Sequence, residues 1–274
     1  MKLLFFGTSN FSKPVFNALQ KAGYSFILWN QENSFEEFKK MAPDICVVAA
    51  YGKIIPKEWL EIPEYGFLNI HPSLLPKYRG PSPIQTAILN GDKETGVTII
   101  LMDKKVDHGP MIANEKLKMK NEKYKELEEK LAGLGAELLI KTLPKWINGE
   151  IKPVEQNHSK TAYAKKFSWL DGKIDWSKSA DEIDRQIRAL NPEPGTWTNW
   201  NNKILKILES LPIEDKNDNL ETGQAFLTEN KETAIKCGLN SALLPKIVQL
   251  EGKKPTEIKS FLNGHKDFVG SKLT

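Results

Sequence analysis

The amino-acid sequence predicts an α/β protein in which a doubly wound, mostly parallel sheet is followed by a small carboxyl-terminal β-barrel domain of the OB-like type. Two observations predict this division. Short apolar runs alternate with helical patterns up to about residue 150, which is typical of a parallel sheet with helices on both faces. Beyond residue 195, short alternating runs are separated by turn residues, which indicates a small barrel or sandwich. The 274 residues suffice for two domains of ordinary size.

The elements of the first half follow from their apolar patterns. The run Leu3–Phe6 opens the chain as a buried strand, and Val15, Phe16 and Leu19 then share one face of a helix. A long amphipathic helix with leucines near one stripe closes this half. We expect strands at residues 3–6, 24–29, 44–50, 66–70 and 97–102, and helices at residues 12–22, 34–41, 82–89 and 120–147.

The second half begins where the composition turns polar, at about residue 150. We place a linker at residues 151–167, between a first domain of residues 1–150 and a second domain of residues 168–274. A helix is expected at residues 180–190, with Ser177 or Ser179 as its N-cap. The strands expected for the barrel are residues 196–200, 203–207, 223–227, 233–237 and 246–250.

The charge balance neither requires nor excludes a nucleic-acid partner. The formal net charge of +4 is mild, whereas domains that bind nucleic acid usually show a stronger basic bias. Lysines are in local excess from Lys231 onward. This excess suits a solvated surface and a phosphate-facing surface about equally well.

The cysteines and the lengths of the apolar runs bear on the compartment. Cys46 and Cys237 are far apart and lack metal-ligand spacing, so we expect reduced thiols and no metal site. The opening run Leu3–Phe6 is too short for a signal segment, and no apolar run reaches the length that spans a membrane. We therefore expect a cytoplasmic protein that does not associate with membranes.

Polar side chains gather at the end of the strand expected at residues 66–70. Asn69 and His71 are two residues apart, so their side chains leave the strand on the same face. The carboxyl ends of parallel strands are where such sheets bind ligands. Prolines and Gly80 hold the following segment in a non-helical loop, and Leu74 and Leu75 in that loop are expected to line a hydrophobic slot.

A carboxylate in a second loop completes a candidate site. Asp107 lies in a turn after the strand at residues 97–102, from which it could reach His71. An amide, an imidazole and a carboxylate in one pocket suit acyl transfer to an amine. The Asn69 amide can donate to the developing oxyanion, and His71 can donate to the same oxygen or relay a proton. Asp107 can orient the imidazole and accept the proton that the amine loses.

The same residues also have a plainer interpretation. An Asn-x-His pair on a strand is more often a structural polar pair than a catalytic one, and Asp107 alone would be a turn residue. His108, His158 and His265 look structural or solvated. Spacing and composition therefore define a candidate site without a reaction.

A known family shares these motifs. Residues 69–76 (NIHPSLLP), followed by the turn at residues 107–110 (DHGP), resemble the signature of the 10-formyltetrahydrofolate-dependent formyltransferases. Residues 78–85 (YRGPSPIQ) and 91–98 (GDKETGVT) resemble more narrowly the branch of that family that acts on methionyl-tRNA. Further matches, at residues 174–176 (IDW), 187–192 (IRALNP) and Trp197, extend the resemblance over nearly the whole chain.

The resemblance implies a role for each position that it matches. The first domain would be catalytic and the second would bind tRNA. The formyl donor would be 10-formyltetrahydrofolate, and the acceptor would be the amine of methionyl-initiator tRNA. We expect a monomer. By resemblance, the catalytic residues are Asn69, His71 and Asp107, and the folate-binding residues are Ser73, Leu74, Leu75, Pro76, Tyr51 and Gly52.

One departure from the family keeps other acceptors open. Relatives usually carry a longer insertion with a basic, tRNA-binding loop, whereas here residues 29–41 are short and include Glu32, Glu36 and Glu37. A sugar-nucleotide amine is therefore an alternative acceptor. Glycinamide ribonucleotide is a second alternative, but Arg79-Gly80 and the second domain argue against it. A non-catalytic tRNA- or folate-binding module would be expected to lack one of the three polar residues, and all three are present.

Overall fold

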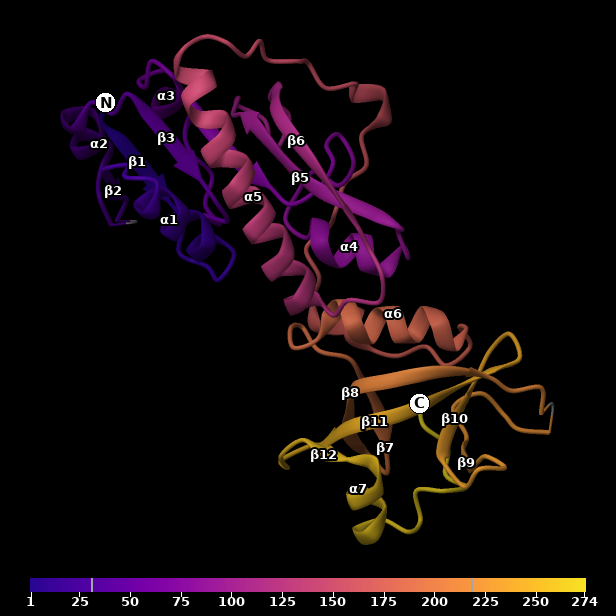
Figure 1. The fold of residues 1–274 in the computed structure, drawn as a ribbon. Helices are drawn as coiled ribbons and strands as arrows, with labels where there is room; N and C mark the ends of the chain where they lie inside the picture. The colour runs from indigo at the N-terminus through magenta and orange to yellow at the C-terminus, as the bar shows by residue number, and fades with distance from the viewer. Residues whose placement is uncertain (31, 218) are drawn as a thin grey trace. The chain divides into compact units, whose positions relative to one another are not determined.

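The protein consists of two compact units (Figure 1). The structure, a computed structural model, describes residues 1–30, 32–217 and 219–274. The first unit comprises Met1–Ala87 and Asp92–Lys166, and the second comprises Ile88–Gly91 and Phe167–Thr274. Most of the segment expected to be a linker, residues 151–166, therefore lies in the first unit.

A six-stranded sheet forms the centre of the first unit, with strand order β2-β1-β3-β4-β5-β6. Its apolar strands β1 and β3 are buried on both faces, as the uninterrupted apolar runs predict. The α/β class is thus confirmed. The strands are β1 (Leu3–Phe6), β2 (Phe26–Leu28), β3 (Ile45–Val48), β4 (Phe67–His71), β5 (Glu94–Leu101) and β6 (Met111–Lys118).

The sheet is mixed but has more parallel than antiparallel pairs, so the expectation of a mostly parallel sheet is confirmed. The pairs β1–β2, β1–β3 and β3–β4 are parallel, whereas β4–β5 and β5–β6 are antiparallel. The strand β6 is not among the strands expected from the sequence. Its residues Asn114, Glu115 and Lys116 are exposed, because β6 is an edge strand and needs no apolar run.

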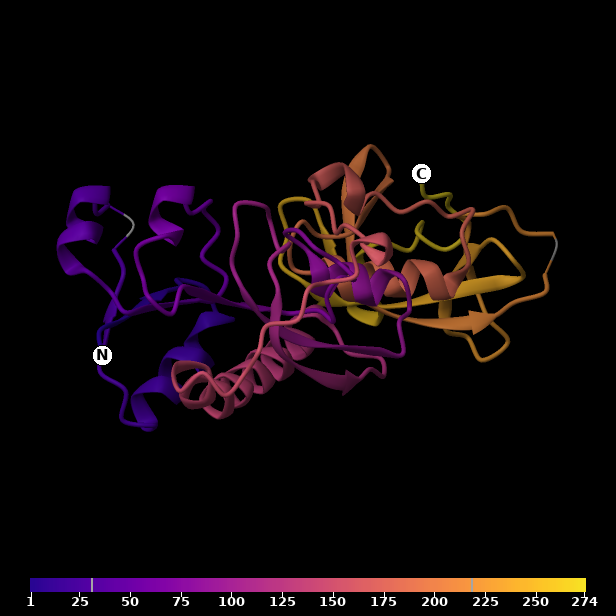
Figure 2. The ribbon, with the colours of Figure 1, turned by 90° about the horizontal axis from the view of Figure 1, so that it is seen from above.

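Helices cover both faces of this sheet. Figure 2 shows α1 and α5 on one side and α2 and α3 on the other. Ser34 caps α2 in a reciprocal pair of hydrogen bonds with Glu37, which fixes the start of that helix. Residue 31, in the short 29–41 segment, lies outside the described residues. The helices that lie wholly or mostly in this unit are α1 (Ser12–Lys21), α2 (Phe35–Met41), α3 (Lys57–Leu60), α4 (Pro83–Leu89) and α5 (Tyr124–Ile147).

Aromatic side chains fill the space between the sheet and α2 and α3. Phe38 of α2 stacks on Trp59 of α3 with ring centres 4.6 Å apart. Phe6 and Phe67 of the sheet pack against the same cluster. Asn69, two residues after Phe67 on β4, leaves the sheet on this face. The cluster therefore forms a rigid wall on the face of the sheet that carries the candidate site.

The second unit combines one long helix with an antiparallel sheet. Ser179 caps the helix α6 (Ala180–Leu190) through a reciprocal pair with Glu182, so one of the two predicted caps is confirmed. Among the described residues, no helix of either unit is long and apolar enough to cross a membrane. The other elements are β7 (Trp197–Trp200), β8 (Lys203–Glu214), β9 (Ala225–Leu227), β10 (Thr233–Cys237), β11 (Ser241–Leu250), β12 (Thr256–Glu257) and α7 (Ile258–Gly264).

The expected OB-like barrel is not confirmed, because the sheet does not close among the described residues. The strand order is β7-β8-β11-β10-β9, and the edge strands β7 and β9 do not pair with each other. The last residues of the chain lie between these edges instead. Thr274 exchanges backbone hydrogen bonds with Asn199 of β7, and the carbonyl of Ser271 accepts from Ala225 of β9. This segment is too short to complete a continuous strand ladder.

Candidate active site

The strand β4 presents Asn69 and His71 on one face of the first sheet. Asn69 lies opposite Ile100 of β5, and His71 lies opposite Thr98. Asn69 is half-buried, and His71 is buried with 5% of its surface exposed. The period of two along the strand therefore places both side chains side by side, as the sequence predicts.

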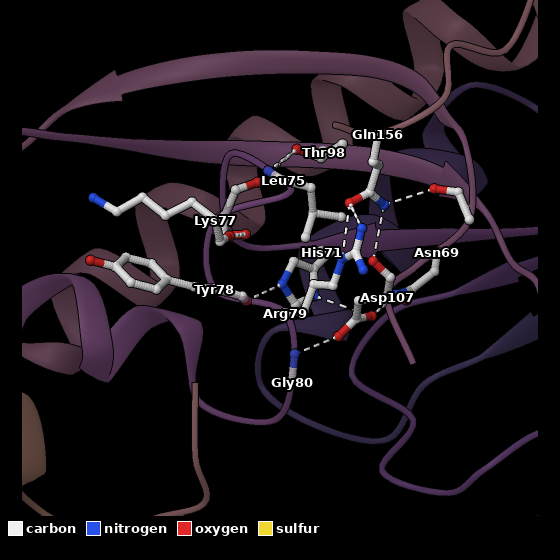
Figure 3. A network of polar contacts seen from close by, with 12 residues as sticks. Asn69, His71, Leu75, Lys77, Tyr78, Arg79, Gly80, Thr98, Asp107 and Gln156 are labelled. Atoms are coloured by element: carbon white, nitrogen blue, oxygen red, sulfur yellow. Dashed lines mark hydrogen bonds and ion pairs between the residues drawn. The ribbon is translucent and has the colours of Figure 1, made fainter. Parts of the chain in front are cut away.

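Asp107 meets both side chains (Figure 3). Its Oδ1 accepts a hydrogen bond from Asn69 Nδ2 at 3.3 Å and lies 3.5 Å from His71 Nδ1. Its Oδ2 accepts from the backbone N–H of Gly80 at 2.8 Å. The side chain of Asp107 is only 12% exposed. The structure thus brings the three predicted polar residues together around one partly buried carboxylate.

The second nitrogen of His71 fixes the orientation of the ring. His71 Nε2 lies 2.9 Å from the backbone carbonyl of Tyr78, and a carbonyl can only accept, so Nε2 carries a hydrogen. In the neutral imidazole the lone pair is then on Nδ1 and faces Asp107. In the protonated form, Nδ1 carries a proton directed toward the same carboxylate. His71 can therefore gain or lose a proton only on the side of the site.

The carbonyl of Tyr78 is itself held in place. Tyr78 adopts a left-handed backbone conformation with φ of 62°, and its hydroxyl donates to Asp92 at 2.8 Å. Lys77 pairs with the same carboxylate at 2.8 Å and lies over the Tyr78 ring. Desolvation would lower the pKa of Lys77, but its hydrogen bonds to Asp92 and Tyr78 outweigh this and raise it. These contacts support the backbone that orients His71.

The loop predicted to bind folate is anchored to β5. The hydroxyl of Thr98 donates to the carbonyl of Ser73 at 2.7 Å and accepts from the N–H of Leu75 at 3.1 Å. The Ser73 hydroxyl donates to the carbonyl of Lys77 at 2.6 Å. Ser73 and Leu75 are buried, whereas Leu74 and Pro76 are half-buried. The two buried residues are thus occupied in holding the shape of the loop.

The other two residues predicted to bind folate lie in the loop after β3. Tyr51 is half-buried and packs edge-on against Phe6 at a ring separation of 5.2 Å. Gly52 is exposed, and its φ of 76° is a conformation that favours glycine. Tyr51 belongs to the periphery of the aromatic cluster on the Asn69 side of the sheet.

Two buried polar residues at the site, Arg79 and Gln156, are not among the site residues expected from the sequence. Arg79 is 2% exposed, and its Nε and Nη2 donate to the side-chain oxygen of Gln156 at 3.1 and 2.7 Å. The Gln156 amide donates in turn to the backbone carbonyls of Asp107 and Gly109. A signal for Arg79 existed: it is one of three arginines among 39 basic residues, and arginine is favoured over lysine in buried hydrogen-bonded positions.

Gly109 is required by the close approach of the Asp107 loop to β5. A Cβ atom at this position would lie 1.9 Å from the backbone carbonyl oxygen of Leu101. Gly109→Ala is therefore expected to shift the loop and to lower the free energy of unfolding by about 1–3 kcal/mol. Chemical denaturation would measure the change, with Gly133→Ala on α5 as the control, since a Cβ there has nothing within 4 Å. Equal stability of Gly109→Ala and the unmodified protein would contradict this account of the loop.

The geometry defines a class of chemistry. The Asn69 amide has a second N–H besides the one bonded to Asp107, and the protonated His71 ring can donate from Nδ1. Both donors lie beside a carboxylate that can accept a proton. In the described parts of the chain, no group of three or more His, Cys, Asp or Glu side chains is arranged to hold a metal ion. Two donors for an oxyanion and an adjacent base suit the transfer of an acyl group to an amine.

Comparison with known proteins specifies this class. Residues 4–143 match the formyl transferase family, and residues 166–266 match the formyl transferase C-terminal domain. The methionyl-tRNA formyltransferase of Clostridium novyi is 41% identical over 242 residues, which cover 87% of this chain and 77% of that protein. The methionyl-tRNA formyltransferase of Dictyoglomus turgidum is 42% identical, again over 87% of this chain and 77% of that protein. The chain therefore belongs to the formyl transferase family and is a formyltransferase.

A solved structure shares the fold. The N-formyltransferase from Helicobacter canadensis, in complex with folinic acid and dTDP-3-aminofucose, superposes with a TM-score of 0.70. It is 20% identical, and the match covers 89% of this chain and 98% of that chain. At this identity the likeness concerns the fold alone.

Proposed function

We propose that this formyltransferase moves the formyl group of 10-formyltetrahydrofolate to the amine of methionyl-initiator tRNA. The chemistry is inferred from one observation: Asp107 Oδ1 lies 3.3 Å from Asn69 Nδ2 and 3.5 Å from His71 Nδ1. The identity of about 40% to methionyl-tRNA formyltransferases over most of both chains supports this acceptor. The enzyme would act as a monomer in the cytoplasm.

The first step is attack of the amine nitrogen on the formyl carbon. The new C–N bond turns the carbonyl oxygen into an oxyanion, and the Asn69 amide donates a hydrogen bond to it. A preorganised donor of this kind contributes about 10²–10³ in rate, because it is stronger for the oxyanion than for the carbonyl. The hydrogen bond of 3.3 Å from Asn69 Nδ2 to Asp107 favours an orientation in which the amide nitrogen faces the site.

The second step removes the proton from the attacking nitrogen and expels tetrahydrofolate. Asp107 accepts the proton of the amine, directly or through a water molecule. His71, protonated at Nδ1, donates to the oxyanion, and its Nε2–H stays bonded to the Tyr78 carbonyl throughout. The bond from the formyl carbon to the folate nitrogen then breaks, and that nitrogen takes up, as it leaves, the proton that Asp107 accepted from the amine. General acid–base assistance of this kind contributes about 10²–10⁴ in rate.

The formyl donor would bind along the loop of Ser73–Pro76 and beside the Tyr51-Gly52 turn. The anchoring of this loop on Thr98 supports the assignment, because a fixed loop gives a planar ring system a preformed surface. The half-buried Leu74 and Pro76 are the apolar groups of the loop that remain partly accessible.

The second unit would contact the tRNA through its lysines. Lys253 and Lys254 are exposed, and we expect them to face phosphates. The double change Lys253→Glu and Lys254→Glu should raise the KM for methionyl-tRNA. The slope of log KM against log salt should fall by about 2, since two phosphate contacts are lost.

Steady-state kinetics at several salt concentrations would measure both quantities. The control is the same double change at Lys125 and Lys141, which are exposed on α5, the helix that covers the face of the sheet away from Asn69. An unchanged salt slope in the Lys253/Lys254 variant would mean that these lysines belong to an ordinary solvated surface and do not face phosphates.

A sugar-nucleotide amine is the second candidate acceptor, and the short segment at residues 29–41 is the observation that favours it. Transfer from 10-formyltetrahydrofolate should be measured side by side with methionyl-tRNA and with an amino-sugar nucleotide. We expect kcat/KM to be far higher with methionyl-tRNA. A higher kcat/KM with the amino-sugar nucleotide would mean that this amine is the acceptor in place of methionyl-tRNA. The proposed chemistry of formyl transfer would be unaffected.

A further inference from the structure

We propose that Gln156 is a positioning residue that holds the Asp107 loop in its reactive conformation. The proposal rests on the proposed function, because it assigns Gln156 an effect on the reaction that acts through Asp107. Gln156 is 3% exposed and lies in the segment of residues 151–167 that the sequence predicts as a linker. Its side chain contacts Arg79 and the backbone of the Asp107 loop (Figure 3).

The Asp107 loop needs an external support. Asp107 adopts a left-handed backbone conformation with φ of 49°, which is unfavourable for a residue with a Cβ atom. Gly109 packs directly on the backbone of β5. The Gln156 Nε2 donates to the Asp107 carbonyl at 2.9 Å and to the Gly109 carbonyl at 2.7 Å. These two bonds clamp the backbone on both sides of His108 and so set the direction of the Asp107 side chain.

The contacts of Gln156 admit only an uncharged amide. Two backbone carbonyls, which only accept, surround the nitrogen end, and two N–H groups of the Arg79 guanidinium, which only donate, surround the oxygen end. All four bonds are satisfied in one orientation. A carboxylate at this position would keep the contacts to Arg79 but would place an acceptor against two carbonyl oxygens.

Arg79 binds the oxygen end of the Gln156 side chain. Its guanidinium is buried, and within the described residues its acceptors are the neutral Gln156 oxygen and Nδ1 of His158, at 2.8 Å from Nη2. The charge of the buried guanidinium polarises the Gln156 amide, whose oxygen accepts its hydrogen bonds. The two hydrogen bonds that the amide nitrogen donates are strengthened as a result. The His158 ring stacks on His108 at a separation of 4.2 Å, and His108 pairs with Asp103. Through Arg79 and His158, Gln156 is thus also connected to His108 and Asp103 of the Asp107 loop.

The variant Gln156→Glu tests this inference, because it keeps the size of the side chain and removes both donors. We expect kcat to fall about ten- to hundredfold, as is usual when a reacting group is displaced by a fraction of an ångström to 1 Å. The KM for the formyl donor should change by less than about threefold, since the folate-binding loop is not touched. Gln156→Asn, which keeps the amide but is one methylene shorter, should show a smaller loss of kcat and serves if Gln156→Glu does not fold.

A matched control exists in the second unit. Gln186 also donates from Nε2 to two backbone carbonyls, those of Asp171 and Lys173, at 2.8 and 3.1 Å. Gln186→Glu therefore removes the same pair of bonds and should leave kcat unchanged. If Gln156→Glu and Gln156→Asn both keep the kcat of the unmodified enzyme, or if Gln186→Glu loses as much activity as Gln156→Glu, the positioning role is wrong.

Two further readouts separate this role from general loss of structure. In an Asp107→Asn background, Gln156→Glu should cost little additional activity, because its effect passes through the carboxylate. In the free protein, Gln156→Glu should accelerate hydrogen exchange at the Gly80 amide, which donates to Asp107 Oδ2, and Gln186→Glu should not. Full additivity of the two substitutions, or unchanged exchange at Gly80, would contradict the proposal. The exchange experiment needs no substrate, so it stands even if the proposed acceptor is wrong.

Discussion

Replacement of Asn69 by alanine is expected to lower kcat for formyl transfer about 10²–10³-fold, the usual effect of removing one oxyanion donor. The KM values should change little, because the lost hydrogen bond forms mainly in the transition state. Asn69 is half-buried and its side chain bonds only loosely to Asp107, so the fold should persist. Single-turnover kinetics with saturating substrates would measure the loss directly.

The control for this experiment is Asn148→Ala. Asn148 Nδ2 also donates to a carboxylate, that of Glu150 at 3.1 Å, but it lies at the exposed end of α5. Its replacement should not change the rate. If Asn69→Ala turned over at the rate of the unmodified enzyme, Asn69 would be a structural polar residue and the oxyanion would have to be stabilised elsewhere.

Replacement of Asp107 by asparagine should have an effect at least as large, about 10²–10⁴-fold on kcat. The substitution preserves size but removes the negative charge that accepts the proton of the amine and faces His71 at 3.5 Å. It also places an amide nitrogen against either the Asn69 amide or the Gly80 N–H, both of which are donors. The rate of formyl transfer and thermal unfolding should be measured together, so that lost chemistry is separated from lost stability.

A neighbouring carboxylate provides a matched comparison. Asp103 lies in the same loop and pairs with His108 at 2.6 Å, as Asp107 pairs with His71. Asp103→Asn should retain most of the activity, because neither Asp103 nor His108 contacts Asn69 or His71 in the proposed reaction. A loss as large in Asp103→Asn as in Asp107→Asn would mean that the loop as a whole, and not the Asp107 carboxylate, determines the rate.

The regular elements were predictable where local patterns decide them. Ser179 and Glu182 form the capping pair that starts α6, and the buried runs of β1 and β3 carry no polar interruption. The edge strand β6 was not predictable from apolar content, because one side of it meets water. The open sheet of the second unit was equally beyond a local pattern, because closure depends on whether two distant edges meet.

Local patterns likewise predict some residues of the candidate site and not others. Asn69 and His71 could be paired from the sequence, since a strand places residues two apart on one face. Asp107 could be placed nearby only as an expectation, because its position depends on the fold of a loop. Gln156 is 49 residues further along the chain than Asp107, in a polar segment without periodicity. Its role depends on long-range contacts, which no local pattern records.

The most direct test of the proposed site is a crystal structure of this protein with 10-formyltetrahydrofolate bound and no acceptor amine present. The proposal predicts a formyl oxygen within hydrogen-bonding distance of Asn69 Nδ2, at about 2.7–3.2 Å, with the folate ring against the Ser73–Pro76 loop. His71 Nδ1 and the Asp107 carboxylate should lie beside the same formyl group. Folate bound with its formyl group out of reach of both Asn69 and His71 would contradict the account.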